Sequence, residues 1–223
     1  MIEVHELQAG VEAAFVQTSR GLAQWPDPYP EPDRSSVPDE AYSRLTNPAK
    51  WRILGARTDA WLMVVVDAGI AVVEWDAAVS WKAQPDPVVS RAERAVPVAV
   101  GALELVVGHS RIGDVDDAGV VLGVGNPAEC VNWFPDCGCD ACDSGSQNEL
   151  DHLDAHLLGI VDGSFRRLSR GEQVISVIAE AWSASGFRTT GRRIGHQVEA
   201  VLAEPHGWSE LRGSSWLDTT SGH

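Results

Sequence analysis

The feature that most constrains this chain is a cluster of thiols. Three of its four cysteines form a C-x-C-x-x-C pattern across residues 137–142, and the fourth stands seven residues before them. In a reducing compartment, clustered cysteines are more often metal ligands or free thiols than disulfides. Zinc requires four ligands at tetrahedral corners, and a C-x-x-C turn brings two thiolates to one ion. The spacing therefore predicts a zinc site in a cysteine-rich loop at residues 130–143, with the ligands Cys130, Cys137, Cys139 and Cys142.

Other interpretations of the cysteines stay open at this stage. If Cys130 is not the fourth ligand, His152, Asp140 or Asp143 are substitutes. The thiols could also be reduced and free of metal, or paired in a disulfide. A C-x-x-C pair before a helix is the arrangement of thioredoxin-like redox sites. However, acidic residues lie within and beside this pair, and they disfavour the reactive thiolate.

Apolar periodicity predicts three helices. They are expected at residues 6–22, 46–69 and 146–163. Gly69 and Gly163 are the expected stop signals of the second and third helices. The third helix is expected to begin with a capping box between Ser146 and Glu149. Gly55 lies inside the second helix at a cost of about 1 kcal/mol relative to alanine, which predicts that a backbone or a ring packs close to it.

The remaining regular structure is predicted to be strand. Strands are expected at residues 70–75, 96–100, 103–108, 119–124, 174–182 and 187–194. Residues 24–38 hold five prolines and are expected to form an extended connector, because proline at this density excludes helix interiors and sheet ladders. Helices and strands do not alternate strictly, so the sequence predicts a single α+β domain over residues 1–223, with a mostly antiparallel sheet and helices packed on it.

The charge of the chain limits its partners. The formal net charge is −15, and no cluster of lysine and arginine offsets it locally, so binding to nucleic acid is disfavoured. A protein partner with a basic surface remains plausible. No apolar run approaches the ~20 residues of a membrane helix, and the N-terminus shows no secretory signal. We therefore expect a cytoplasmic protein that does not insert into membranes.

The run Phe134-Pro-Asp-Cys-Gly-Cys-Asp-Ala-Cys-Asp143, followed by a leucine-rich helix, resembles the signature of a family of uncharacterised actinobacterial proteins. The similarity extends to residues 42–48 and covers approximately residues 40–170. The C-G-C-D-A-C-D run is the constant feature of this family. Because no activity is assigned to the family, the resemblance implies a shared structural role for the three clustered cysteines and no particular function.

Three hypotheses about function follow. The first is a non-enzymatic binding domain whose cysteine loop is a structural zinc clip. The second is an enzyme or small-ligand binder with a tryptophan-lined cleft, which would use His109 or His196 with carboxylates that the sequence does not pair with them. The third is a thiol redox protein acting through Cys139 and Cys142. The sequence leaves open whether the protein is an enzyme and favours the first hypothesis.

Overall fold

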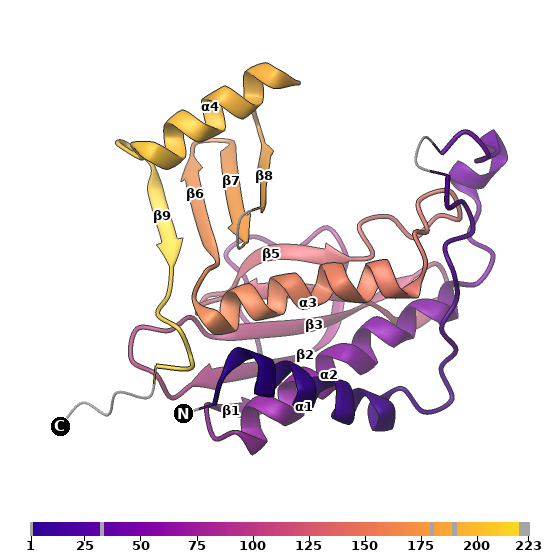
Figure 1. Ribbon diagram of the computed structural model, residues 1–223, viewed down its shortest axis with the longest axis horizontal. Coiled ribbons are helices and arrows are strands. Elements are labelled where there is room, and N and C mark those ends of the chain that lie inside the picture. Colours follow the sequence, from indigo (N-terminus) through magenta and orange to yellow (C-terminus); the bar gives the residue numbers. More distant parts are fainter. Residues whose placement is uncertain (1, 32–33, 179–180, 189–190, 219–223) are drawn as a thin grey trace.

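The computed structural model describes residues 2–31, 34–178, 181–188 and 191–218. Within these residues the chain forms four α-helices and two antiparallel sheets (Figure 1). This is the α+β fold with an antiparallel sheet that the sequence predicts. The sequence predicts one sheet, however, whereas strands β6 to β9 (residues 166–212) form a second, separate sheet.

The first sheet is a five-stranded meander in the order β1-β2-β3-β4-β5. Its strands are β1 (Ala71–Glu74), β2 (Val89–Pro97), β3 (Leu105–Ile112), β4 (Val115–Val124) and β5 (Glu129–Phe134). Residues 105–110 of β3 and 118–124 of β4 are buried without alternation. These two central strands are covered on both faces, because the chain around Trp81 packs on the face opposite the helices.

Three helices cover one face of this sheet (Figure 1). They are α1 (Val4–Thr18), α2 (Arg52–Asp67) and α3 (Ser146–Asp162), and two 3₁₀ turns, Asp39–Ser43 and Pro48–Trp51, precede α2. The apolar stripes of the three helices and the inner face of the sheet form one continuous core. Gly69 and Gly163 follow α2 and α3 with φ of +69° and +79°, as the stop signals predict.

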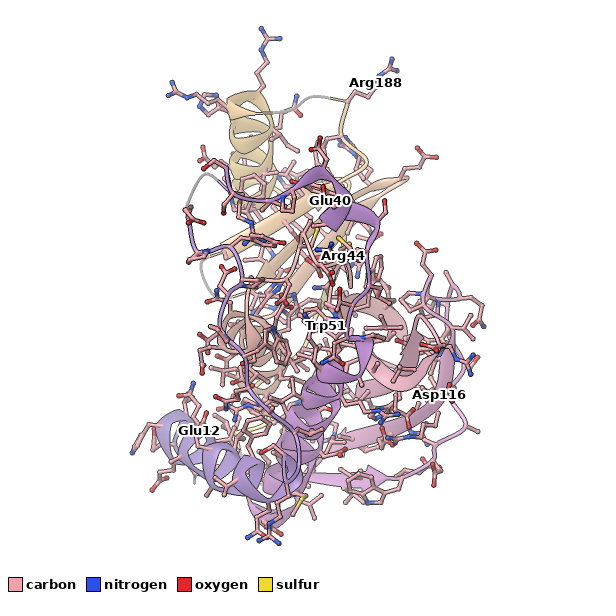
Figure 2. The ribbon with its side chains drawn as sticks, turned by 90° about the vertical axis from the view of Figure 1, so that its right-hand side faces the viewer. Glu12, Glu40, Arg44, Trp51, Asp116 and Arg188 are labelled. Carbon is pink, nitrogen blue, oxygen red and sulfur yellow. The ribbon has the colours of Figure 1, made fainter. Side chains whose placement is uncertain are left out.

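The second sheet has four strands in the order β8-β7-β6-β9 and carries α4 (Arg192–Ala203) on one face. Its strands are β6 (Arg166–Arg170), β7 (Gln173–Ile178), β8 (Ala181–Ser185) and β9 (Ser209–Arg212). It has its own small core, centred on Leu168, Ile175 and Val198. Figure 2 places this part of the molecule, with Arg188, at the end opposite α1 and Glu12.

The C-terminal segment returns from β9 to the first sheet through Trp216. This side chain is fully buried, and its Nε1 donates a hydrogen bond to the Leu103 carbonyl at 3.1 Å. The Trp216 amide donates to the Val161 carbonyl at the end of α3 at 2.8 Å. Trp216 is therefore the anchor that holds the tail against α3 and the meander.

Several local predictions are wrong. Of the strand expected at residues 96–100, only Val96 and Pro97 are strand, at the end of β2. The strand expected at 174–182 is divided between β7, which ends at Ile178, and β8, which begins at Ala181. The strand expected at residues 187–194 is not formed, because β8 pairs with β7 and α4 already begins at Arg192; residues 189–190 lie outside the described residues. The capping box is also absent, because Ser146 is the first residue of α3 and its hydroxyl bonds to Trp25. The Glu149 carboxylate accepts instead from the Ser144 hydroxyl at 2.8 Å.

In the described part of the chain, no helix combines the length and the apolar composition that crossing a membrane would require.

Candidate metal centre

The loop between β5 and α3 brings three cysteines together. The Sγ atoms of Cys137, Cys139 and Cys142 all lie within 4.8 Å of one another, and 3.3 Å separates those of Cys137 and Cys139. Cys139 is buried, whereas Cys137 and Cys142 are exposed at the surface of the loop. Zinc–sulfur bonds of about 2.3 Å place tetrahedral sulfurs about 3.8 Å apart, so small rotations of these side chains suffice to enclose one ion.

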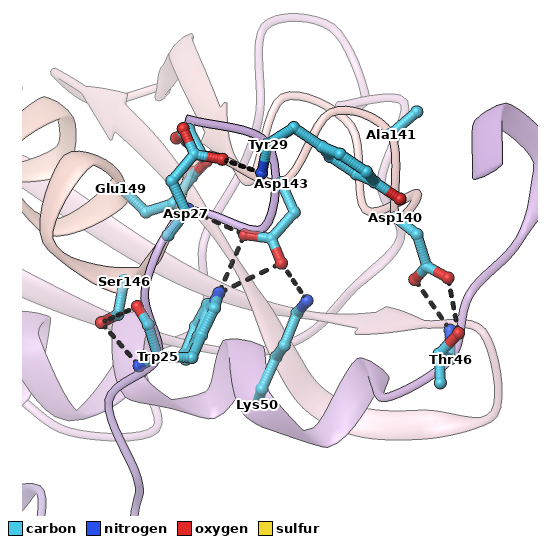
Figure 3. Close-up of polar contacts among 12 residues, drawn as sticks. Trp25, Asp27, Tyr29, Thr46, Lys50, Asp140, Ala141, Asp143, Ser146 and Glu149 are labelled. Carbon is cyan, nitrogen blue, oxygen red and sulfur yellow. Dashed lines mark hydrogen bonds and ion pairs between the residues drawn. The ribbon is translucent and has the colours of Figure 1, made fainter. Parts of the chain in front are cut away.

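Asp140, which lies between the cysteines, fixes the loop to the chain that precedes α2 (Figure 3). Its carboxylate accepts from the Thr46 amide at 3.0 Å, from the Thr46 hydroxyl, and from Arg44 Nε at 2.7 Å. Burial acts to raise the pKa of Asp140, but the hydrogen bonds from Thr46 and the Arg44 charge outweigh it and lower the pKa to about 2. Asp140 is therefore a structural anchor, committed to Thr46 and Arg44.

Asp143 forms the second anchor of the loop. Its nearly buried carboxylate accepts from Trp25 Nε1 at 2.8 Å and from the Gly145 amide at 2.9 Å, and it forms an ion pair with Lys50 (Figure 3). The Lys50 ammonium also lies over the rings of Trp25 and Trp51, 5.2 and 4.9 Å from their centroids. Asp143 thus connects the loop to Trp25 and to Lys50, the two ends of the segment 25–50.

The proline-rich segment 24–38 packs on this loop. Arg34 Nη2 donates to the carbonyls of Ala141 and Asp143, at 2.6 and 3.1 Å. Tyr29 and Val37 pack against a small apolar cluster that includes Cys139. Trp25 and Tyr29 thus both dock the connector onto the loop; residues 32–33 lie outside the described residues.

The electrostatics of the three thiols differ. Burial acts to raise the pKa of Cys139, but hydrogen bonds from the Cys137 thiol and from the amides of Cys142 and Ala141 lower it overall. Burial, together with the neighbouring sulfurs, raises the pKa of Cys142 to about 12. The buried central sulfur therefore has the better-stabilised thiolate. A cation at the centre of the cluster would favour the thiolate form of all three cysteines.

Cys130 is not part of this cluster. It lies in β5, opposite Gly123 of β4, and its carbonyl accepts a hydrogen bond from Arg167. Burial raises the pKa of its thiol. The structure thus brings together three of the four predicted ligands, and the cysteine-rich loop proper begins after β5 has ended at Phe134.

The proposed substitute ligands are not in the cluster either. Asp140 and Asp143 are used as anchors. His152 and His156 share a face of α3, and their ring centroids lie 4.8 Å apart. Each ring makes a T-shaped contact with the ring of Phe134, at centroid distances of 5.2 and 5.1 Å. Within the described residues, three sulfurs are therefore the complete set of close ligands, and a fourth coordination position would be open.

Comparisons with known proteins place the chain in a family. Residues 11–219 match the family of unknown function DUF6226. The chain belongs to this family. No curated protein and no solved structure matches it. The expectation of an uncharacterised family is confirmed, whereas the actinobacterial source and the motif as its constant feature stay predictions.

A second group of functional candidates lies in the meander itself, and sequence reasoning identified only one of its two members. His109 on β3 and Glu93 on β2 are both buried, and His109 Nε2 lies 2.8 Å from Glu93 Oε2. The sequence singled out His109 but could not identify its carboxylate, because the pair depends on the register of the two strands. The other candidate, His196, lies exposed on α4.

The tryptophans of this DUF6226 member do not gather in one cleft. Trp75, Trp133 and Trp182 line three different cavities, beside β1, β5 and β8 respectively. Trp51 and Trp216 belong to the core.

Proposed function

We propose that this protein is a non-enzymatic interaction domain that holds one zinc ion through Cys137, Cys139 and Cys142. The observation that supports it is the grouping of the three sulfurs within 4.8 Å. Thiolate ligands favour zinc over the hard cations magnesium and calcium, which prefer oxygen. Three protein ligands leave the fourth position to a water molecule or to an exogenous group.

The role of this ion would be structural. The three cysteines lie in six consecutive positions, so the ion closes only a short turn. That turn carries Asp140 and precedes Asp143, the two anchors to residues 25–50. Fixing the turn therefore fixes the orientation of both carboxylates, and the binding free energy of the ion adds to the stability of the docked segment.

The interaction role is supported by an apolar surface at the β1 edge of the first sheet. Exposed apolar side chains from α2, from the edge strand β1 and from the end of β2 surround a cavity of about 490 Å³. They include Met63, Val66, Val72, Trp75 and Val98. Contiguous exposed apolar surface of this kind marks interaction sites in soluble proteins. Because the whole chain carries a formal net charge of −15, we propose a protein with a basic surface as the partner.

Elemental analysis tests the metal site. Protein purified without added metal or chelator should contain one zinc per chain, and its thiols should react only after denaturation. Cys137→Ser, Cys139→Ser and Cys142→Ser should each lose the ion, whereas Cys130→Ser, the matched control, should retain it. Four reactive thiols without metal would reduce the loop to a packing feature. Fewer than four thiols without metal would mean a disulfide and favour the redox alternative.

Crosslinking tests the interaction surface. A photoreactive residue at position 75 should capture a partner, whose affinity is then measured with the purified proteins. Trp75→Ser should weaken this affinity at least tenfold, whereas Trp182→Ser, which changes a partly exposed tryptophan on β8, should not. A captured protein with an acidic surface, or equal affinities for the two variants, would contradict the proposed role of this surface.

A further inference from the structure

The buried pair of His109 and Glu93 leaves one histidine nitrogen without a partner. The Glu93 carboxylate also forms an ion pair with Arg91 through its other oxygen, and only 1% of the His109 side chain and 2% of the Glu93 side chain are exposed. A carboxylate accepts hydrogen bonds, so in a neutral imidazole it places the single hydrogen on Nε2 and leaves Nδ1 as an acceptor. Among the described residues, Nδ1 of His109 has no hydrogen-bond partner.

An unpartnered nitrogen of this kind destabilises a folded protein, because a buried acceptor without a donor costs about 1–3 kcal/mol of stability. Its neighbour on α2 is Gly55, the glycine whose cost in the helix predicts a close ring or backbone. A Cβ atom at Gly55 would lie 3.6 Å from Nδ1 and 3.5 Å from Cε1 of His109. The glycine therefore confirms the predicted close ring, and it leaves a space beside that ring which no side chain of α2 occupies.

This space belongs to a cavity of about 360 Å³ between the end of α1, α2 and the strands β2 and β3. Its lining carries both signs of charge. Arg91 is occupied by Glu93 and by Asp117, whose carboxylate lies 3.6 Å away. Arg52 donates to the Asp116 carbonyl at 3.2 Å, and Arg20 makes no ion pair within the described part of the chain.

We propose that this cavity binds a small oxyanion that carries its own hydroxyl group, such as hydrogen phosphate or a hydroxylated phosphate ester. The hydroxyl donates to Nδ1 of His109, and the anionic oxygens face Arg20 and Arg52. A donor alone would satisfy Nδ1, but the two guanidinium groups without a carboxylate partner favour an anion. Asp59 faces the same cavity, and burial raises the pKa of its carboxyl.

Titration with three probes tests the proposal on the intact protein. Inorganic phosphate, glycerol 3-phosphate and sulfate are compared by calorimetry at pH 7.5 and constant ionic strength. Sulfate has similar size and charge but no hydrogen to donate at this pH. We expect phosphate or glycerol 3-phosphate to bind saturably and at least tenfold more tightly than sulfate. The ratio of the affinities for phosphate and for glycerol 3-phosphate then shows whether the site prefers the free ion or the ester. Equal affinity for sulfate, or no saturable binding, would overturn the proposal.

Gly55→Ala separates binding from folding. Alanine is the better helix former and its methyl group meets only the His109 ring at ordinary contact distance, so the variant should fold with an equal or higher melting temperature. The methyl group would stand 3.6 Å from Nδ1 and take up the space beside the ring, so affinity for the tighter phosphate probe should fall at least tenfold. Full affinity in a folded Gly55→Ala variant would overturn the proposal, whatever the other variants do.

Arginine variants and a spectroscopic signal complete the test. Arg20→Gln should weaken binding several-fold, whereas Arg188→Gln, at the far end of the molecule, should not (Figure 2). The ¹⁵N resonance of His109 Nδ1 should shift on addition of the tighter phosphate probe and not on addition of sulfate. A shift confined to residues outside the cavity would place the anion elsewhere and contradict the assignment.

Discussion

At the scale of single residues, Asp140 and Asp143 have a different role from the cysteines between which they lie or which they follow. Their neighbouring positions suggest metal ligands, yet both carboxylates bond to residues 25–50, more than 90 positions away in sequence. The sequence carries no sign of this, because side chains of the same type serve as ligands, caps and ion-pair partners. What the spacing did predict is the approach of Cys137, Cys139 and Cys142, since a short turn leaves them little freedom to separate.

Asp143→Asn tests the buried anchor. The change removes the negative charge beside Lys50, whose side chain is only 17% exposed, and leaves an ammonium group without its counterion. Removing one partner of a buried ion pair costs about 3 kcal/mol, and we expect this loss in the free energy of unfolding measured with urea. Asp116→Asn, at an exposed pair with Arg111, is the matched control and should change stability by less than about 0.5 kcal/mol.

Asp140 predicts a pH dependence. Its pKa in the folded protein is lowered to about 2 from the ordinary 3.8, so its carboxylate stabilises the fold above the ordinary value. That contribution should disappear as the pH falls from about 4 to about 2. We expect Asp140→Asn to be less stable than the natural protein at pH 5, and the difference to shrink at pH 2.5. A difference that is the same at both pH values would show that Asp140 does not act through its charge.

At the scale of elements, periodicity succeeded where an element has one buried face. The helices at 6–22, 46–69 and 146–163 correspond to α1, α2 and α3, whose apolar stripes face one core. The short strands β5, β6 and β9 were missed, because four to six residues give too little pattern to separate strand from loop. Most of the longer strand β2 was missed too, because Pro85 and Pro87 break the pattern just before it. Residues 192–203 form α4 although apolar residues 198–203 were not assigned to a helix, because their partner surface is a separate sheet.

The docking of the cysteine loop makes a prediction about hydrogen exchange. The Asp140 amide donates to the Arg44 carbonyl at 2.8 Å, and the Ala141 amide donates to the Ala41 carbonyl at 3.2 Å. If an ion holds the turn, Cys139→Ser should loosen both contacts and speed exchange at these two amides at least tenfold, because local opening becomes easier. Cys130→Ser should leave them unchanged. Equal exchange in both variants would mean that the aspartate anchors hold the loop without help from the cysteines.

At the scale of the whole molecule, two bodies of different size share one chain. The larger is built on the meander and the three helices, and the smaller on the second sheet and α4. The tail crosses from one to the other and anchors at Trp216. The sequence could not divide the strands between two sheets, because strand pairing over long separations depends on packing that local pattern does not encode.

Net charge gives the last prediction. The chain carries 32 acidic and 17 basic residues, and the resulting self-repulsion opposes the compact state. Among the described residues, several ion pairs have at least one well-exposed partner, and such pairs contribute little. Raising sodium chloride from about 20 to about 300 mM shortens the range of charge interactions to less than about 10 Å. We therefore expect the melting temperature to rise with salt, measured in a buffer without phosphate or sulfate so that an oxyanion at His109 does not contribute. A melting temperature that falls with salt would mean that local attractions, led by the buried pair of Lys50 and Asp143, outweigh the repulsion among the acidic residues.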